Sequence, residues 1–151
     1  MSIPLFFLFS AFACSPSSES SRIDRSEIPS SYKIVIGEGG GFAGLWTGYS
    51  ILPGDTLLEW HGRTPEENAV FAGTLPTDTV AVLWHEIRSQ QLLDHAPTAV
   101  QANFVQILSI TLDGKDHDFG WLVSTDRDTT ASQAREFRAR CLKAIHESLG
   151  H

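Results

Sequence analysis

Two strand-like runs separated by an Asp-Gly pair constrain the fold of this chain more than any other feature. Residues 103–112 and 115–123 both combine alternating apolar positions with β-branched or aromatic side chains. Asp113 and Gly114 between them are typical of a two-residue hairpin loop, in which both residues adopt positive φ angles. The sequence therefore predicts a long antiparallel hairpin. The residues of its second strand that are expected to face the core are Phe119, Trp121 and Val123.

Three shorter strand-like runs precede this hairpin, at residues 32–36, 45–52 and 56–61. A glycine-rich stretch separates the first two, and a Pro-Gly-Asp turn separates the last two. The alternation directs Trp46 to the face of the sheet opposite that of Leu45. In the third run, we expect Leu58 and Trp60 to point inward.

Two further segments carry apolar residues at helical spacing, at residues 75–93 and 132–149. Thr77 is the expected N-cap of the first helix, and Cys141 lies on the apolar stripe of the second. The elements together predict an α+β fold, in which an antiparallel sheet of about five strands packs two helices on one face. A chain of 151 residues has room for one such domain.

The N-terminus carries a separate signal. Residues 3–13 are uncharged and almost wholly apolar, but the run is too short to span a membrane. Ala11 and Ala13 are small residues at the spacing that signal peptidases favour, and Cys14 follows, ahead of a Ser-rich stretch. This arrangement resembles the bacterial lipobox, although Ala11 replaces the usual Leu. An ordinary secretory signal or a buried N-terminal strand are the alternatives.

The lipobox resemblance divides the chain into three parts. Residues 1–13 would be a signal peptide, residues 14–31 a Ser-rich tether, and residues 32–151 the folded domain. It implies lipidation at Cys14, a membrane contact through that lipid, and a place in the cell envelope. Ser15 stands where an Asp would direct enterobacterial lipoproteins to the inner membrane, which favours the outer membrane or its periplasmic face.

Composition and motifs argue against several chemistries. The net charge of −7 disfavours a nucleic-acid partner. Residues 39–44 have the spelling of a dinucleotide fingerprint, but a strand follows them where a helix is required. His85-Glu86 lacks the second His of a zinc-protease helix, and the acidic residues 113–118 lack calcium-loop spacing. The sequence therefore predicts no catalytic residue, no metal site and no cofactor.

One group of residues suggests binding instead. Phe42 lies within a cluster of glycines, with Trp46 and Trp60 on the strands that follow. Aromatic side chains on an exposed connection commonly anchor protein partners. The alternative is that Phe42 folds back over the edge of the sheet. The candidate partner-binding residues are Gly40, Gly41, Phe42, Ala43, Gly44, Trp46 and Trp60.

The order of elements resembles the emfourin-like family, small protein inhibitors of thermolysin-type metalloproteases. The resemblance extends over residues 32–149, with an inserted stretch at residues 53–73. The matching residues are Gly40-Gly41-Phe42-Ala43-Gly44, Leu75-Pro76, Leu92-Leu93-Asp94, Phe104 to Gly114, and the last helix from Ser132.

This resemblance implies a non-catalytic domain that inhibits a secreted or periplasmic metalloprotease. An alternative interpretation of the same residues is that the domain is an envelope module, which binds another protein or a glycan without inhibiting a protease.

Overall fold

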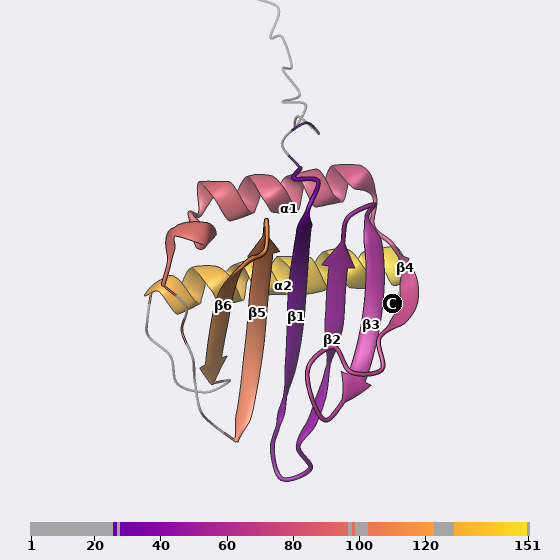
Figure 1. Ribbon diagram of the computed structural model, residues 1–151, viewed down its shortest axis with the longest axis vertical. Helices are drawn as coiled ribbons and strands as arrows, with labels where there is room; N and C mark the ends of the chain where they lie inside the picture. Colours follow the sequence, from indigo (N-terminus) through magenta and orange to yellow (C-terminus); the bar gives the residue numbers. More distant parts are fainter. Residues whose placement is uncertain (1–25, 27, 97, 99–102, 123–128, 151) are drawn as a thin grey trace, which may run out of the picture.

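The computed structural model describes residues 26, 28–96, 98, 103–122 and 129–150 (Figure 1). These residues form six strands, two α-helices and one short 3₁₀ helix. In chain order the elements are β1 (Tyr32–Gly40), β2 (Leu45–Leu52), β3 (Thr56–Gly62), β4 (Val70–Thr74), α1 (Thr77–Ser89), η2 (Leu92–Asp94), β5 (Phe104–Leu112), β6 (Lys115–Leu122) and α2 (Thr129–Leu149).

The six strands form one antiparallel sheet in the order β4-β3-β2-β1-β5-β6, which confirms the α+β fold. The hairpin around Asp113 and Gly114 is present, and both residues have positive φ angles of 50° and 79°. About five strands were expected from the sequence, and β4 was not among them. This edge strand has five residues, and a bulge at Ala72 interrupts its alternation.

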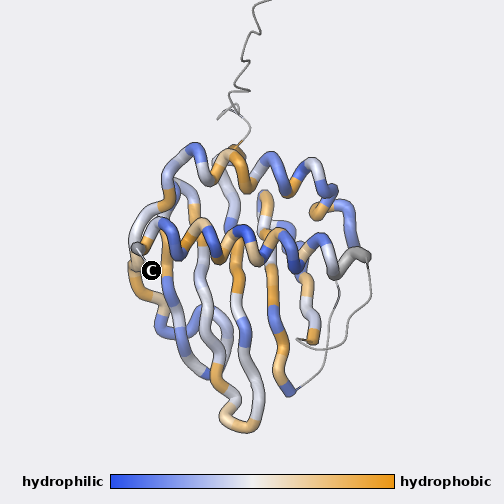
Figure 2. The backbone as a smooth tube through the Cα atoms, turned by 180° about the vertical axis from the view of Figure 1, so that it is seen from behind, coloured by the Kyte–Doolittle hydropathy of each residue, from blue (hydrophilic) through white to orange (hydrophobic). Residues whose placement is uncertain are grey.

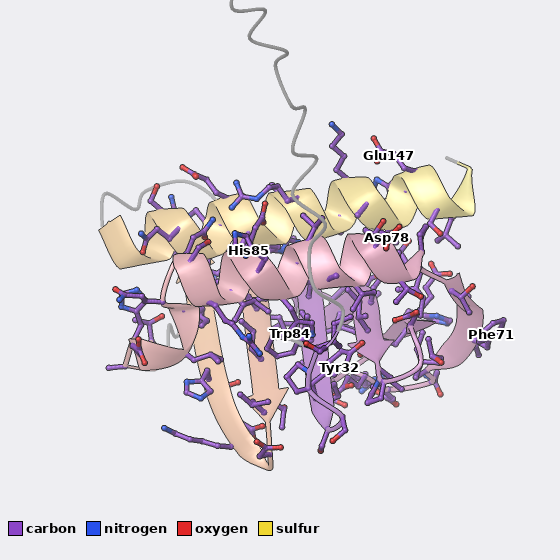
Figure 3. All side chains as sticks on the ribbon, turned by 90° about the horizontal axis from the view of Figure 1, so that it is seen from above. Tyr32, Phe71, Asp78, Trp84, His85 and Glu147 are labelled. Carbon is purple, nitrogen blue, oxygen red and sulfur yellow. The ribbon has the colours of Figure 1, made fainter. Side chains whose placement is uncertain are left out.

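Both helices lie against the same face of the sheet, as predicted (Figures 1 and 2). Strand residues that point to this face alternate with residues that point to the open face. In Figure 3, Trp84 of α1 points down towards the sheet and lies beside Tyr32 of β1, and the two rings meet edge-on with centroids 5.2 Å apart. The fully buried core side chains include Ile34, Ile36, Ile51, Leu57, Leu108, Ile110, Phe137, Cys141 and Ile145.

The predicted core of the hairpin and of α2 is largely confirmed. Phe119 and Trp121 are buried, whereas Val123 lies outside the described residues. Cys141 is buried on the apolar stripe, and its burial raises the pKa of the thiol far above the usual range. A buried thiol with a raised pKa is a packing residue, because only the thiolate is a strong nucleophile.

Two predicted boundaries were wrong. β1 does not end at Ile36 but continues to Gly40, since residues 37–40 pair with both β2 and β5. The first helix runs from Thr77 to Ser89 rather than over residues 75–93, and its N-cap is Pro76. The Thr77 hydroxyl instead donates to Asp55 Oδ2 at 2.5 Å, which ties α1 to the β2–β3 turn.

The inward side of β3 was also predicted wrongly. Leu57, not Leu58, joins the core beneath the helices. Trp60 is fully buried but points to the opposite, open face, because it alternates with Leu57 along the strand and pairs with Gly48.

The ordered domain begins slightly before residue 32. Ile28 packs against the core, and the Ser31 carbonyl accepts a hydrogen bond from Asp113 N at 3.4 Å. Cys14 and the remainder of the predicted tether up to residue 25 lie outside the described residues. Within the part of the chain that the structure describes, no helix is long and apolar enough to cross a membrane.

The packing of Tyr32 predicts a pH dependence. Burial, and secondarily the charge of Asp55, raises the pKa of the Tyr32 phenol to about 12. The folded state therefore holds this proton between pH 10 and 12, whereas the unfolded chain releases it near pH 10. Stability should be complete below pH 10 and fall as the pH rises towards 12. Urea unfolding at pH values from 9 to 12 measures this fall.

Tyr32→Phe provides the control for this experiment. The variant lacks the titrating group and should lose less stability over the same pH range, while also losing the hydrogen bond from the phenol to the Leu52 carbonyl (3.1 Å). Identical pH slopes for the two proteins would contradict the assignment.

Candidate functional site

The turn between β1 and β2 forms the tip of the sheet farthest from the start of β1 (Figure 1). Its backbone needs glycine, because Gly40, Gly41 and Gly44 have φ angles of 101°, 68° and 58°. Gly41 N donates to the Asn103 carbonyl next to β5, and Gly44 N donates to the Gly41 carbonyl at 3.2 Å. The turn is therefore attached to three strands: its two ends continue β1 and β2, and its first residue is bound beside β5.

Phe42 stands fully exposed on this turn and does not fold back over the sheet edge. Leu45 and Phe104 flank it with 59% and 43% of their surfaces exposed, and the register places both opposite Gly40 on the same face. The Phe104 ring lies against Gly41, since a Cβ atom at Gly41 would be 4.0 Å from Phe104 Cδ2. We call Phe42, Leu45 and Phe104 the tip patch.

Trp46 is separated from the tip patch because it points to the open face of the sheet. Its ring lies over Gly39, where an added Cβ atom would come within 2.5 Å of Trp46 Cγ. Trp46 also lines a groove on that face and remains partly exposed. The structure therefore brings Trp46 close to the turn but turns its ring away from Phe42.

Trp60 is buried on the open face because glycines make room for its ring. Gly37 and Gly48 lie beneath it, and a Cβ atom at Gly48 would come within 2.5 Å of Trp60 Cζ2. The Trp60 indole N–H donates to Ser50 Oγ at 3.1 Å. With no exposed surface, Trp60 can support a binding surface but cannot contact a partner, which removes it from the predicted contact set.

The β3–β4 loop is held against this face by Glu66. The Glu66 carboxylate accepts hydrogen bonds from Ser50 Oγ at 2.8 Å and from Lys33 Nζ at 2.7 Å. In Figure 1 the loop crosses in front of the sheet, whereas the helices lie behind it. Through Glu66, the loop is thus hydrogen-bonded to Ser50, the acceptor of the Trp60 indole N–H.

A polar network under α2 was not predicted from the sequence. Arginine side chains usually face solvent, but Arg138 of α2 is 8% exposed and donates to Glu38 Oε2 at 3.1 Å and to the Gly37 carbonyl at 3.3 Å. Gln106 donates to the same carboxylate and accepts from the Trp121 indole. Burial lowers the pKa of Arg138, and the adjacent Glu38 opposes that shift. This network supports the half of the sheet that carries the tip patch.

The residues that were considered for chemistry do not converge in the described structure. Glu86 forms an ion pair with Arg140 at 2.6 Å, and Asp116 accepts a hydrogen bond from Thr111 Oγ1 at 2.7 Å. Among the described residues, no group of three or more His, Cys, Asp or Glu side chains could hold a metal ion. Comparison with known proteins adds no assignment, since no family model matches the chain and no curated protein matches it significantly.

Ser50→Ala tests the support beneath the loop. The variant leaves the buried Trp60 indole N–H without its acceptor and removes one of the two anchors of Glu66. We expect it to lower the free energy of unfolding by about 1–3 kcal/mol, the usual cost of an unsatisfied buried donor. Urea unfolding measures the loss, and hydrogen exchange of the Trp60 indole should accelerate.

The matched control is Thr47→Ala on the same strand, whose side chain is exposed. It should change stability by less than about 1 kcal/mol, within the range of strand propensities. A Ser50→Ala variant as stable as the control would show that the loop is held by other contacts.

Proposed function

We propose that this domain works by binding a protein partner through the tip patch, and that the partner is a thermolysin-type metalloprotease of the cell envelope, which the domain inhibits. The observation that carries the binding proposal is the full exposure of Phe42 on a turn with hydrogen-bonded ends. A fully exposed Phe side chain contributes no hydrophobic stabilisation to the isolated domain, yet a large aromatic residue is a typical anchor of an interface.

The turn is suited to binding because its backbone is already ordered. The Gly41–Asn103 and Gly44–Gly41 hydrogen bonds restrict the backbone before any partner arrives. Binding therefore costs less conformational entropy than it would for a mobile loop. If the segment entered a protease cleft, its attachment to β1 and β2 would also resist the separation of chain ends that follows cleavage.

The choice of a metalloprotease rests on the emfourin-like resemblance, whose closest motif is the turn itself, residues 40–44. The structure adds that Phe42 is the most exposed large apolar residue of the described chain and that it lies within this motif. Inhibition by a protruding turn, whose backbone is held by hydrogen bonds and by the strands on either side, is consistent with both observations. The competing function, binding of another envelope protein or a glycan, uses the same surface and is distinguished by experiment.

Lipid anchoring through Cys14 fits the direction in which the tip patch points. β1 begins at Tyr32, near the end of the chain that would carry the lipid, and it finishes beside the turn at the opposite end of the sheet (Figure 1). A strand of nine residues spans about 30 Å. An anchored domain would therefore present Phe42 on the side away from its attachment to the tether.

Phe42→Ala is the direct test of the tip patch. We expect the purified domain to inhibit a thermolysin-type protease at micromolar excess, and we expect Phe42→Ala to weaken inhibition at least ten-fold, as for a central aromatic anchor. The measurement is residual hydrolysis of a peptide substrate at a series of inhibitor concentrations. Phe71→Ala is the matched control, because Phe71 is also an exposed Phe but lies on the edge strand β4 (Figure 3).

Three outcomes separate the alternatives. Equal losses for Phe42→Ala and Phe71→Ala would exclude the tip patch as the contact surface. No inhibition at any concentration would exclude the protease as partner. A Phe42-dependent pull-down of a different protein or a glycan from envelope extract would then assign the domain to non-inhibitory interaction.

Cys14→Ser tests the anchor. Radiolabelled palmitate should be incorporated into the full-length protein and should be absent from the variant, because the thioether needs the Cys sulfur. The domain should then shift from the membrane fraction to the soluble fraction. Absence of label from the unmodified protein would refute lipidation, and binding by the tip patch would be unaffected by that result.

A further inference from the structure

The open face of the sheet contains a groove of about 660 Å³, a volume within the range of roughly 300–1,000 Å³ found for small-molecule sites. Its floor is β5, with part of β1 beside it. One wall consists of Trp46 and the β3–β4 loop at Pro65 and Glu66, and Thr98 stands beside β6 on the other side. The loop that Glu66 ties to Ser50 and Lys33 thus also forms one side of the groove.

The strand register divides the groove into an apolar end and a polar end. Towards the tip of the sheet, Trp46, Val105 and Ile107 line it. Towards the start of β1, Ser109 and Thr111 lie on the floor, and their partners on β6 are Asp118 and Asp116. From Val105 to Thr111 the floor runs six residues, or about 20 Å. An amphiphilic molecule has this same division.

The polar end is negatively charged. Asp116 and Asp118 alternate on β6, so both carboxylates point to the open face. Lys33 is the groove's basic residue among those described, but its ammonium group is bound to Glu66 at 2.7 Å. Lys33 therefore does not neutralise the carboxylates of Asp116 and Asp118, which are complementary to a cationic group.

The groove suits a small molecule better than a peptide. Its floor strands pair on both sides, so their backbone N–H and C=O groups already bond within the sheet. A buried peptide would need a partner for each of its own backbone groups. The floor offers only two hydroxyls for that purpose, and that of Thr111 already donates to Asp116 Oδ1 at 2.7 Å, which leaves Ser109. A molecule with one polar end and no further hydrogen-bonding groups avoids this cost.

We propose that this groove binds a single free aliphatic amine, with its chain along Val105 and Ile107 beside Trp46 and its ammonium group at Asp116 and Asp118. The site lies on the open face and does not include the tip patch. It is therefore independent of the proposed protease contact.

The probe is decylammonium, compared with decyl sulfate, which has the same chain and the opposite charge. Both are titrated into the purified domain below their micelle-forming concentrations. Acrylamide quenching of Trp fluorescence reports on Trp46, since the other three Trp residues are at most 1% exposed and are shielded from the quencher. Decylammonium should bind at least ten-fold more tightly than decyl sulfate and should protect Trp46 from acrylamide quenching.

Asp116→Asn combined with Asp118→Asn should weaken decylammonium binding at least ten-fold and leave decyl sulfate binding no weaker. The matched control is Asp113→Asn, an exposed position of the hairpin loop that does not line the groove, where Asn tolerates the φ angle of 50°. Ile107→Thr should weaken binding of both probes, and Phe42→Ala should change neither.

Several results would overturn the proposal. Equal affinities for the two probes would show that the carboxylates do not select the head group. An unchanged affinity of the doubly substituted protein for decylammonium would show that the two carboxylates do not bind the ammonium group. The absence of saturable binding of decylammonium would show that the groove is not a site for it. A loss upon Phe42→Ala would move the binding to the tip patch.

Discussion

Burial of apolar side chains between one face of the sheet and the two helices is the interaction on which the rest of this molecule depends. Residues such as Ile36, Trp84 and Phe137 become inaccessible to water there, and the described residues form no comparable layer on the other face. An antiparallel sheet can leave its second face to water. In this chain, a loop lies over one part of that face and a groove lies at another.

The aromatic residues of this chain consequently have three different roles. Trp84 and Trp121 fill the layer beneath the helices, Trp60 is buried on the open face against two glycines, and Phe42 remains in solvent. The β3–β4 loop also affects the charge of that face. Through Glu66 it binds Lys33, and the two carboxylates on β6 then determine the charge of the groove.

The fold was predictable where a local pattern and the tertiary environment agree. The Asp113-Gly114 hairpin and the stripe of α2 are such cases, because turn chemistry and helical spacing each indicate one structure. The extension of β1 through residues 37–40 was not predictable, since glycines form a strand only when neighbours on both sides pair with them. Likewise, its charge marks Arg138 as a surface residue, and only the ion pair with Glu38 of β1, 100 residues away, explains its burial.

The strand order also bears on when the domain can fold. β1 comes first in the sequence but lies in the middle of the sheet, and one of its two neighbours is β5, so that Glu38 meets Gln106 across 68 residues. Long-range pairings of this kind form slowly, because the chain must close a large loop before the contact stabilises it. While the chain is being synthesised, β1 lacks that neighbour until most of the sequence has emerged. The apolar face of β1, which includes Ile34 and Ile36, therefore cannot reach its final buried environment for most of that time.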